Sequence, residues 1–140
     1  MIEYDKFRSS LKRLQEQYVN YRGTDNLRLD SIMREAVAES VIHRFEICYD
    51  CLWKVLRRYL TEELGVANAP NSPKPVFRLA FENNILSSPI EKWIDYANSR
   101  INTSHDYDEG KARRCLGIVS DFIDDAVDIY ETMSRKSWNR

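Results

Sequence analysis

Glycine and long apolar runs are scarce in this sequence. Only four of its 140 residues are glycine, and no Gly-x-x-x-x-Gly-Lys-Ser/Thr pattern occurs, so the chain has no glycine-rich loop to cradle a nucleotide phosphate. No apolar run approaches the ~20 residues that a membrane-spanning helix needs. The opening residues, Met-Ile-Glu-Tyr-Asp-Lys, lack the basic and apolar regions of a signal peptide. We therefore expect a cytoplasmic protein that does not enter a membrane.

A large excess of either charge is also absent. The 21 lysines and arginines nearly balance the 22 aspartates and glutamates, so no basic field covers the chain in the way that holds a general nucleic-acid binder on phosphate. Any contact with RNA would therefore have to be local.

Cysteine is also in short supply. Three cysteines, in a chain with no export signal, argue against a disulfide framework. Cys48 and Cys51 have the CxxC spacing, but no second cysteine pair or nearby histidine pair completes a zinc site. We expect ordinary thiols inside a helix, with no metal and no cofactor.

Apolar residues recur at spacings of three and four along three long stretches. These stretches are residues 4–21, 32–60 and 112–133, and each pattern places the apolar side chains on one stripe of an amphipathic helix. No stretch alternates apolar and polar residues as a strand does. The sequence therefore predicts a helical protein.

Turn signals divide the rest of the chain. Gly65 indicates a helix end, and the prolines that follow predict a loop over residues 66–75. A short helix is expected from Val76 to the Asn83-Asn84 pair, and Ser88-Pro89-Ile90-Glu91 has the N-cap, first-turn proline and capping-box glutamate of another. The sequence thus predicts one all-α domain over residues 1–140, an antiparallel up-and-down bundle of four to five helices.

A polar segment, residues 99–109, separates the last two apolar stripes and is poor in helix formers. Arg100 and His105 are five positions apart, which is about 140° around an uninterrupted helix, so they converge only if the helix ends between them. The short polar side chains of Asn102, Thr103 and Ser104 compete for backbone hydrogen bonds and favour such an end.

Beyond that expected end, extended backbone would turn His105 and Tyr107 to the same side, because alternate residues of an extended chain share a face. Asp108 could then cap the last helix. Arg100, His105 and Tyr107 are therefore the candidate residues of a shared pocket.

The pattern Arg100-x4-His105-x-Tyr107 resembles the motif of HEPN domains that pair with minimal nucleotidyltransferases in toxin-antitoxin modules. The resemblance extends from about the thirties to the end of the chain. The segments that resemble the "nucleotidyltransferase substrate binding protein" branch are Arg44-Phe45-Glu46, Tyr49-Asp50-Cys51-Leu52-Trp53-Lys54, Ser72-Pro73-Lys74-Pro75-Val76-Phe77-Arg78 and Thr103-Ser104-His105-Asp106-Tyr107.

This resemblance implies a homodimer and a metal-independent endoribonuclease, in which arginine and histidine of both subunits meet at the interface. Arg100 would bind the scissile phosphate, and His105 would transfer a proton from the ribose 2′-hydroxyl. Tyr107 would receive adenylate from the partner nucleotidyltransferase, the cognate antitoxin, and Asn102 and Ser104 would help to bind substrate or modifying group. The chain itself is not the nucleotidyltransferase.

One position departs from the family pattern. Many ribonuclease members have a polar residue, often asparagine, directly after the motif arginine, whereas this chain has Ile101 and places Asn102 one position later. A non-catalytic subunit that binds RNA or a nucleotide for the nucleotidyltransferase therefore remains an alternative. A plain helical interaction protein is the third.

Ordinary structural roles are expected outside the motif. His43 is expected to be solvated or hydrogen-bonded rather than catalytic. Arg44, Glu46 and Asp50 lie near the core stripe and could pair across helices or support the motif pocket. Three larger sets have a structural expectation and a functional alternative. The aromatic residues Phe45, Tyr49 and Trp53 could stack bases, but residues at helical spacing are expected in the core or a dimer interface. The charged helix faces are expected in solvent, although the basic one could guide RNA and the acidic one could meet a basic partner: Lys54, Arg57 and Arg58; Asp121, Asp124, Asp125, Asp128 and Glu131.

Overall fold

The computed structural model describes residues 1–24, 31–105 and 108–138, with the backbone alone at positions 104 and 105. Over these ranges the chain forms helices and no strand, which confirms the predicted all-helical bundle. The five helices are α1 (Asp5–Gly23), α2 (Ser31–Glu62), α3 (Pro73–Glu82), α4 (Ile90–His105) and α5 (Glu109–Ser134).

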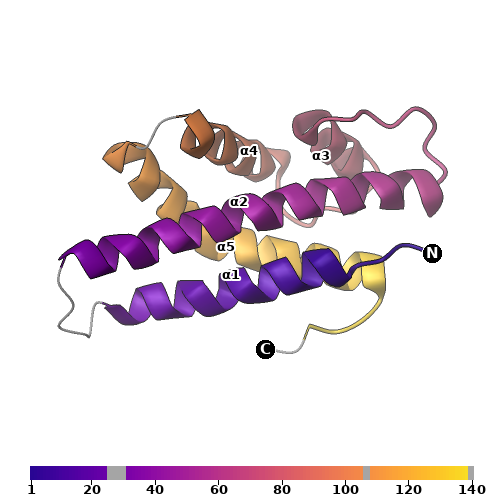
Figure 1. The fold of residues 1–140 in the computed structure, drawn as a ribbon. Helices are drawn as coiled ribbons and strands as arrows, with labels where there is room; N and C mark the ends of the chain where they lie inside the picture. The colour runs from indigo at the N-terminus through magenta and orange to yellow at the C-terminus, as the bar shows by residue number, and fades with distance from the viewer. Residues whose placement is uncertain (25–30, 106–107, 139–140) are drawn as a thin grey trace.

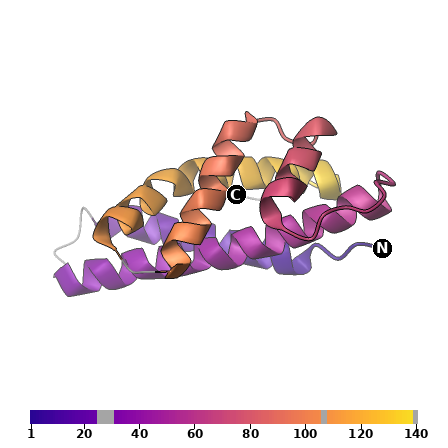
Figure 2. The same ribbon diagram turned by 90° about the horizontal axis from the view of Figure 1, so that it is seen from above.

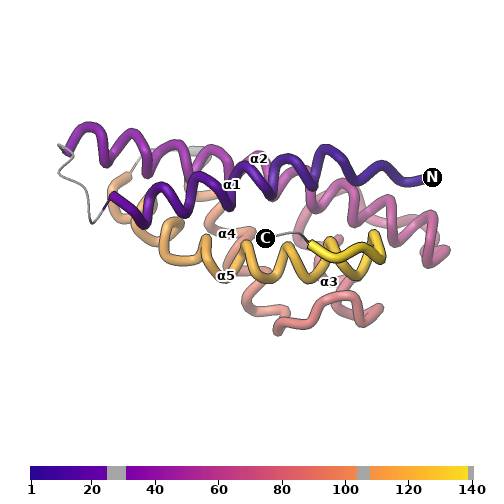
Figure 3. Tube along the Cα trace, turned by 90° about the horizontal axis from the view of Figure 1, so that it is seen from below, coloured from indigo at the N-terminus to yellow at the C-terminus, as the bar shows by residue number. Residues whose placement is uncertain are grey.

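The helices fall into a long set and a short pair. α1 and α2 lie side by side in antiparallel directions, and α5 packs against both (Figure 1). α3 and α4 form an antiparallel pair that crosses α2 (Figure 2). Seen from below, the C-terminal residues return toward α1 (Figure 3), where the Trp138 indole donates a hydrogen bond to Gln15 at 3.2 Å. None of the described helices is long and apolar enough to cross a membrane.

Buried side chains from all five helices form one cluster. Aromatic rings hold its centre: Phe45 of α2 meets Phe122 of α5 edge to face at 4.9 Å, and Phe77 of α3 stacks on Trp93 of α4 at 4.8 Å. Such ring pairs stabilise the fold by about 0.5–1.5 kcal/mol beyond the contribution of their buried area. The prediction that Phe45 and Tyr49 belong to the core is confirmed, whereas Trp53 is half-buried at its edge.

Two helix ends agree with their turn signals, and one helix begins earlier than expected. Gly65 and Asn84 follow α2 and α3 with φ values of 68° and 60°, the left-handed conformation that ends helices. The predicted loop over residues 66–75 is too long, because α3 already begins at Pro73. Prolines fit this first turn since its backbone N–H groups have no partner within the helix.

The predicted helix end between Arg100 and His105 is wrong, because α4 continues through His105. The hydroxyl of Thr103 donates to the Glu46 carboxylate of α2 at 3.0 Å and also lies 3.2 Å from the Arg100 carbonyl within the helix, so one proton is shared between the two acceptors. The last turn of α4 is thus tied to α2, and this tertiary contact offsets the weak helix propensity of the polar segment.

The expectation of a fully solvated acidic face on α5 is also wrong at one position. Asp125 is only 8% exposed and accepts hydrogen bonds at 2.5 Å from the hydroxyls of Tyr96 and Ser88. Lys92 of α4 adds an ammonium group 3.7 Å from the same carboxylate. A buried carboxylate needs such partners, and here it joins the start of α4 to α5.

Candidate functional site

Arg100 crosses from α4 to two carboxylates of α2. Its Nε and Nη2 donate to the two carboxylate oxygens of Asp50 at 3.2 and 3.0 Å, and its Nη1 donates to Glu46 at 3.3 Å. Glu46 and Asp50 are four residues apart and therefore lie on one face of α2. The prediction that these acids could pair across helices is confirmed, and the hydrogen bond to Asp50 raises the pKa of Arg100.

These bonds fix the Arg100 guanidinium without covering it. Three of its five N–H groups donate to the two carboxylates, which leaves two that bond to no described residue. The side chain keeps 25% of its surface exposed. The guanidinium is therefore held in one orientation and still has donors for an external anion such as a phosphate.

The other predicted site residues are described to different extents. Asn102 is exposed on α4. His105 lies on the same continuous helix as Arg100, so their positions are about 140° apart around the axis. The side chains of Ser104 and His105, and the whole of Tyr107, lie outside the described residues. The structure therefore places Arg100 and leaves its proximity to His105 and Tyr107 a prediction.

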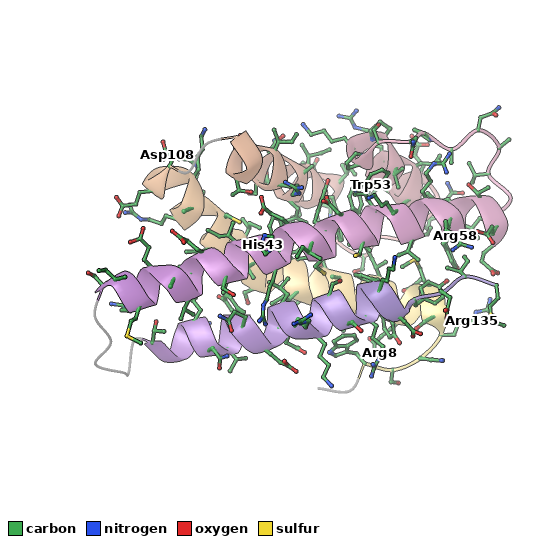
Figure 4. The ribbon with its side chains drawn as sticks, in the orientation of Figure 1. Arg8, His43, Trp53, Arg58, Asp108 and Arg135 are labelled. Carbon is green, nitrogen blue, oxygen red and sulfur yellow. The ribbon has the colours of Figure 1, made fainter. Side chains whose placement is uncertain are left out.

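Asp108 caps α5 as the sequence predicted. Its carboxylate accepts hydrogen bonds from the backbone N–H groups of Gly110 at 2.7 Å and Lys111 at 3.1 Å. The bonds from Lys111 and Gly110 lower the pKa of Asp108. Figure 4 shows Asp108 at the start of α5.

A hollow of about 170 Å³ lies beside this cap and reaches Glu46, Thr103 and His43. The His43 imidazole is exposed, as expected, and its Nδ1 is 3.8 Å from a Glu46 oxygen. Glu46 is thus shared between His43, Thr103 and Arg100. The sequence suggested that Glu46 could support the motif pocket, but it did not connect His43 with that pocket.

A larger groove of about 550 Å³ opens on the other side of Arg100. Its walls come from α2, the first turn of α3 and α4, and include Trp53, Lys54, Lys74 and Ile101. Sequence reasoning did not assign Lys74 or Ile101 to a common site. The Ser72–Pro75 segment, which carries part of the family resemblance, was the available signal.

The cysteines take no part in these hollows around Arg100. Cys48 and Cys115 are buried and Cys51 is half-buried, and all three are free thiols. Burial raises the pKa of Cys115 to about 12 and also raises the pKa of Cys48. Within the described ranges, no group of three histidine, cysteine, aspartate or glutamate residues is arranged to hold a metal ion.

A helical bundle of this topology has the fold of HEPN-like proteins. Residues 2–135 match the model of the family "Nucleotidyltransferase substrate binding protein like", and the chain belongs to this family. It is 25% identical over 113 residues to the probable ribonuclease HepT of Haemophilus influenzae, a match that covers 76% of this chain and 74% of that relative.

Two solved structures are similar in fold. One is a Haemophilus influenzae protein described as having the fold of a substrate binding domain of a nucleotidyltransferase, with a TM-score of 0.84, 21% identity and coverage of 94% of this chain and 99% of that one. The other is a protein of Thermus thermophilus, with a TM-score of 0.66, 26% identity and coverage of 86% and 98%.

Proposed function

We propose that this protein is a metal-independent endoribonuclease, the toxin of a two-component module whose antitoxin is a minimal nucleotidyltransferase. The observation that carries the proposal is the Arg100 guanidinium, which Asp50 and Glu46 hold in place while it stays partly exposed. A rigid donor of this kind suits the recognition of a scissile phosphate. The relative named probable ribonuclease HepT supports the same chemistry.

In the proposed reaction the ribose 2′-oxygen attacks the adjacent phosphorus. His105 takes the 2′-hydroxyl proton, the bond from phosphorus to the 5′-oxygen breaks, and the products are a 2′,3′-cyclic phosphate and a 5′-hydroxyl that gains a proton. Arg100 offsets the negative charge that develops on the phosphate oxygens. A base and an acid are both needed, so one motif histidine per chain favours a homodimer with two.

The continuous course of α4 supports the same homodimer. Positions 100 and 105 face directions about 140° apart on one helix, so a single chain gives the pair no common face. In a symmetric dimer, His105 of one chain can approach Arg100 of the other. We assign the complete site to such a dimer, with Asn102 and Ser104 at its edge as substrate-binding residues.

Neutralisation would occur at Tyr107. The nucleotidyltransferase would transfer adenylate from ATP to the phenol oxygen and release pyrophosphate. The new phosphate adds negative charge beside the motif and competes with RNA for Arg100.

One observation favours the alternative of a non-catalytic substrate-binding subunit. Two carboxylates surround Arg100, so the cluster has no net positive charge to attract RNA. Ile101, in place of a polar residue, is consistent with a site that binds without cleaving. In this alternative the protein presents RNA or a nucleotide to the nucleotidyltransferase.

Inducible expression tests the two functions. Wild type, Arg100→Ala and His105→Ala are compared with and without the nucleotidyltransferase, and Arg8→Ala on α1 (Figure 4) is the matched control for loss of an exposed arginine. We expect growth arrest with RNA cleavage for wild type and Arg8→Ala, relief by the partner, and no arrest for the two motif variants. Intact RNA and normal growth with wild type would reject the ribonuclease and favour the non-catalytic subunit.

Purified protein gives the chemical test. RNA cleavage should persist in EDTA and leave 2′,3′-cyclic phosphate ends. Cleavage that stops in EDTA and returns with a divalent cation would contradict the proposed reaction.

A further inference from the structure

The groove beside Arg100 has an apolar wall that no other part of the proposed reaction uses. Trp53 is half-buried on α2, Pro73 and Pro75 stand in the first turn of α3, and Ile101 on α4 is 45% exposed. Figure 4 shows Trp53 where α2 passes beneath α3 and α4. A hollow of about 550 Å³ with an aromatic ring in its wall has the size and surface of a site for a flat organic group.

The rim of the same groove is cationic. Lys54, Lys74 and Arg100 line it together with Asp50. Asp50 and Glu46 both bond to Arg100 and offset its charge, so the positive charge of the rim comes from the two lysines. The first turn of α3 forms one wall, so the positive end of that helix dipole adds to the rim. The whole chain has a net charge of −1, so this local concentration of positive charge stands out against an otherwise balanced protein.

A buried donor next to Arg100 is left without a partner. The hydroxyl of Tyr49, whose residue is 1% exposed and lines the groove, makes no hydrogen bond with any described residue. A buried hydroxyl without a partner is unfavourable and rare in folded proteins. The hydroxyl itself is buried, so a polar ligand atom in the groove would reach it only after the surrounding side chains moved.

The aromatic ring and the cations are close enough to act on one ligand. The Lys54 ammonium lies 5.8 Å from the centre of the Trp53 ring, and Arg100 lines the same groove. A flat ring stacked on Trp53 would therefore lie in a groove that also holds Lys54, Lys74 and Arg100 as donors for phosphates. A nucleobase with its neighbouring phosphates has this arrangement.

We propose that the groove between α2, α3 and α4 is a subsite for one unpaired nucleobase of single-stranded RNA, which stacks on Trp53 while Lys54 and Lys74 bind the flanking phosphates. The inference rests on the proposed function, because it places this nucleotide next to the phosphate held by Arg100. Ile101 then has a positive role: it extends the apolar wall against the base. The proposal gives the Ser72–Pro75 segment a function in substrate binding.

Single-stranded RNA fits better than a duplex. Base faces are hidden by their neighbours in a double helix and become available to aromatic side chains in single strands. Stacking of this type tolerates different bases, and flanking lysines add sequence-independent attraction. We therefore expect weak base preference and a strong dependence of affinity on salt.

The binding test uses the full chain and a short single-stranded oligonucleotide with 2′-O-methyl riboses, which cannot be cleaved by 2′-hydroxyl attack. Trp53→Leu removes the ring, and Lys74→Glu reverses one charge. Phe81→Leu, an exposed aromatic on α3, and Lys12→Glu, an exposed lysine on α1, are the matched controls. Circular dichroism confirms that each variant is folded.

We expect Trp53→Leu to weaken binding by about fivefold or more, the change that loss of one stacked base gives, and both controls to stay within about twofold. Lys74→Glu should also weaken binding, and more strongly at low salt, because it reverses a charge that faces phosphate. Trp53→Phe should bind nearly as well as wild type. Oligonucleotide should quench wild-type tryptophan fluorescence and should not quench it in Trp53→Phe, because Trp93 and Trp138 are buried. Unchanged affinity in Trp53→Leu and Lys74→Glu would overturn the subsite.

Two competitors identify the ligand. A duplex of the same sequence or free AMP that bound as tightly as the single strand would overturn the assignment to single-stranded RNA.

A cleavage assay distinguishes failure of the proposed ribonuclease from failure of the proposed subsite. Wild type that binds through Trp53 but never cleaves RNA would reject the ribonuclease and keep the subsite, whereas cleavage with unaltered KM in Trp53→Leu would reject the subsite alone.

Discussion

The Nη2 atom of Arg100 lies 3.0 Å from the Oδ2 atom of Asp50, and this contact joins two helices at residues fifty positions apart. Both side chains are partly exposed, so the ion pair contributes only about 0.2–1 kcal/mol to stability. Its larger consequence is geometric. Asp50 engages two nitrogens of one planar guanidinium and thereby sets the direction of the remaining donors.

Replacing Asp50 by asparagine should therefore harm cleavage more than binding. Asp50→Asn removes a negative charge, so attraction of Arg100 for RNA phosphate should not fall, but the guanidinium loses its fixed orientation. We expect at least about a tenfold lower single-turnover cleavage rate at saturating RNA, the order expected when a positioned group moves out of line. Weaker RNA binding with an unchanged saturated rate would show that Asp50 does not position Arg100.

Tyr107→Phe should separate toxicity from its neutralisation. Phenylalanine keeps the ring and removes the oxygen that would accept adenylate. We expect the variant to arrest growth like wild type and to continue doing so when the nucleotidyltransferase is co-expressed. Intact-protein mass spectrometry should show added adenylate on wild type and on the control Tyr21→Phe, and none on Tyr107→Phe. Relief of Tyr107→Phe by the partner would indicate neutralisation by binding alone.

Asp125→Ala should destabilise the fold far more than Asp124→Ala, the same change at the neighbouring position. The change leaves the buried hydroxyl of Tyr96 and that of Ser88 without their shared acceptor, and we expect a loss of at least about 2 kcal/mol in the free energy of unfolding. Asp124→Ala, at an exposed position, should stay within about 0.5 kcal/mol. Urea denaturation compares the two, and similar midpoints would mean that Asp125 contributes no more than a surface carboxylate.

Stability should fall at alkaline pH. Burial raises the pKa of Tyr4 to about 12, and burial together with the hydrogen bond to Asp125 also raises the pKa of Tyr96. A phenol in the unfolded chain loses its proton near pH ~10. Above that pH the unfolded state binds fewer protons than the folded state, so the stability contributed by these groups is complete below about pH 10 and declines above it.

Urea midpoints between about pH 8 and about pH 11 measure this decline. The slope above pH ~10 should be shallower in Tyr96→Phe than in wild type, because the variant lacks one of the titrating phenols. Equal slopes in the two proteins would show that Tyr96 ionises alike in both states.

The regular helices were predictable because their information is local. Apolar spacing along residues 4–21, 32–60 and 112–133 matches α1, α2 and α5 to within a few residues, and Asp108 caps α5 as its position predicted. The polar composition of residues 99–109 misled the assignment of α4. Local preference at Asn102 and Thr103 was outweighed by a bond from Thr103 to α2.

The sequence by itself determined the helical class, the stripe on each long helix and the motif that carries the family resemblance, because these depend on residues close together in the chain. Only the tertiary structure decided that Asp50 and Glu46 hold Arg100, that Asp125 is buried under Tyr96, and that Trp53 and Lys74 share a groove with Arg100. Those relationships join side chains from different helices, and their geometry follows from how the helices pack.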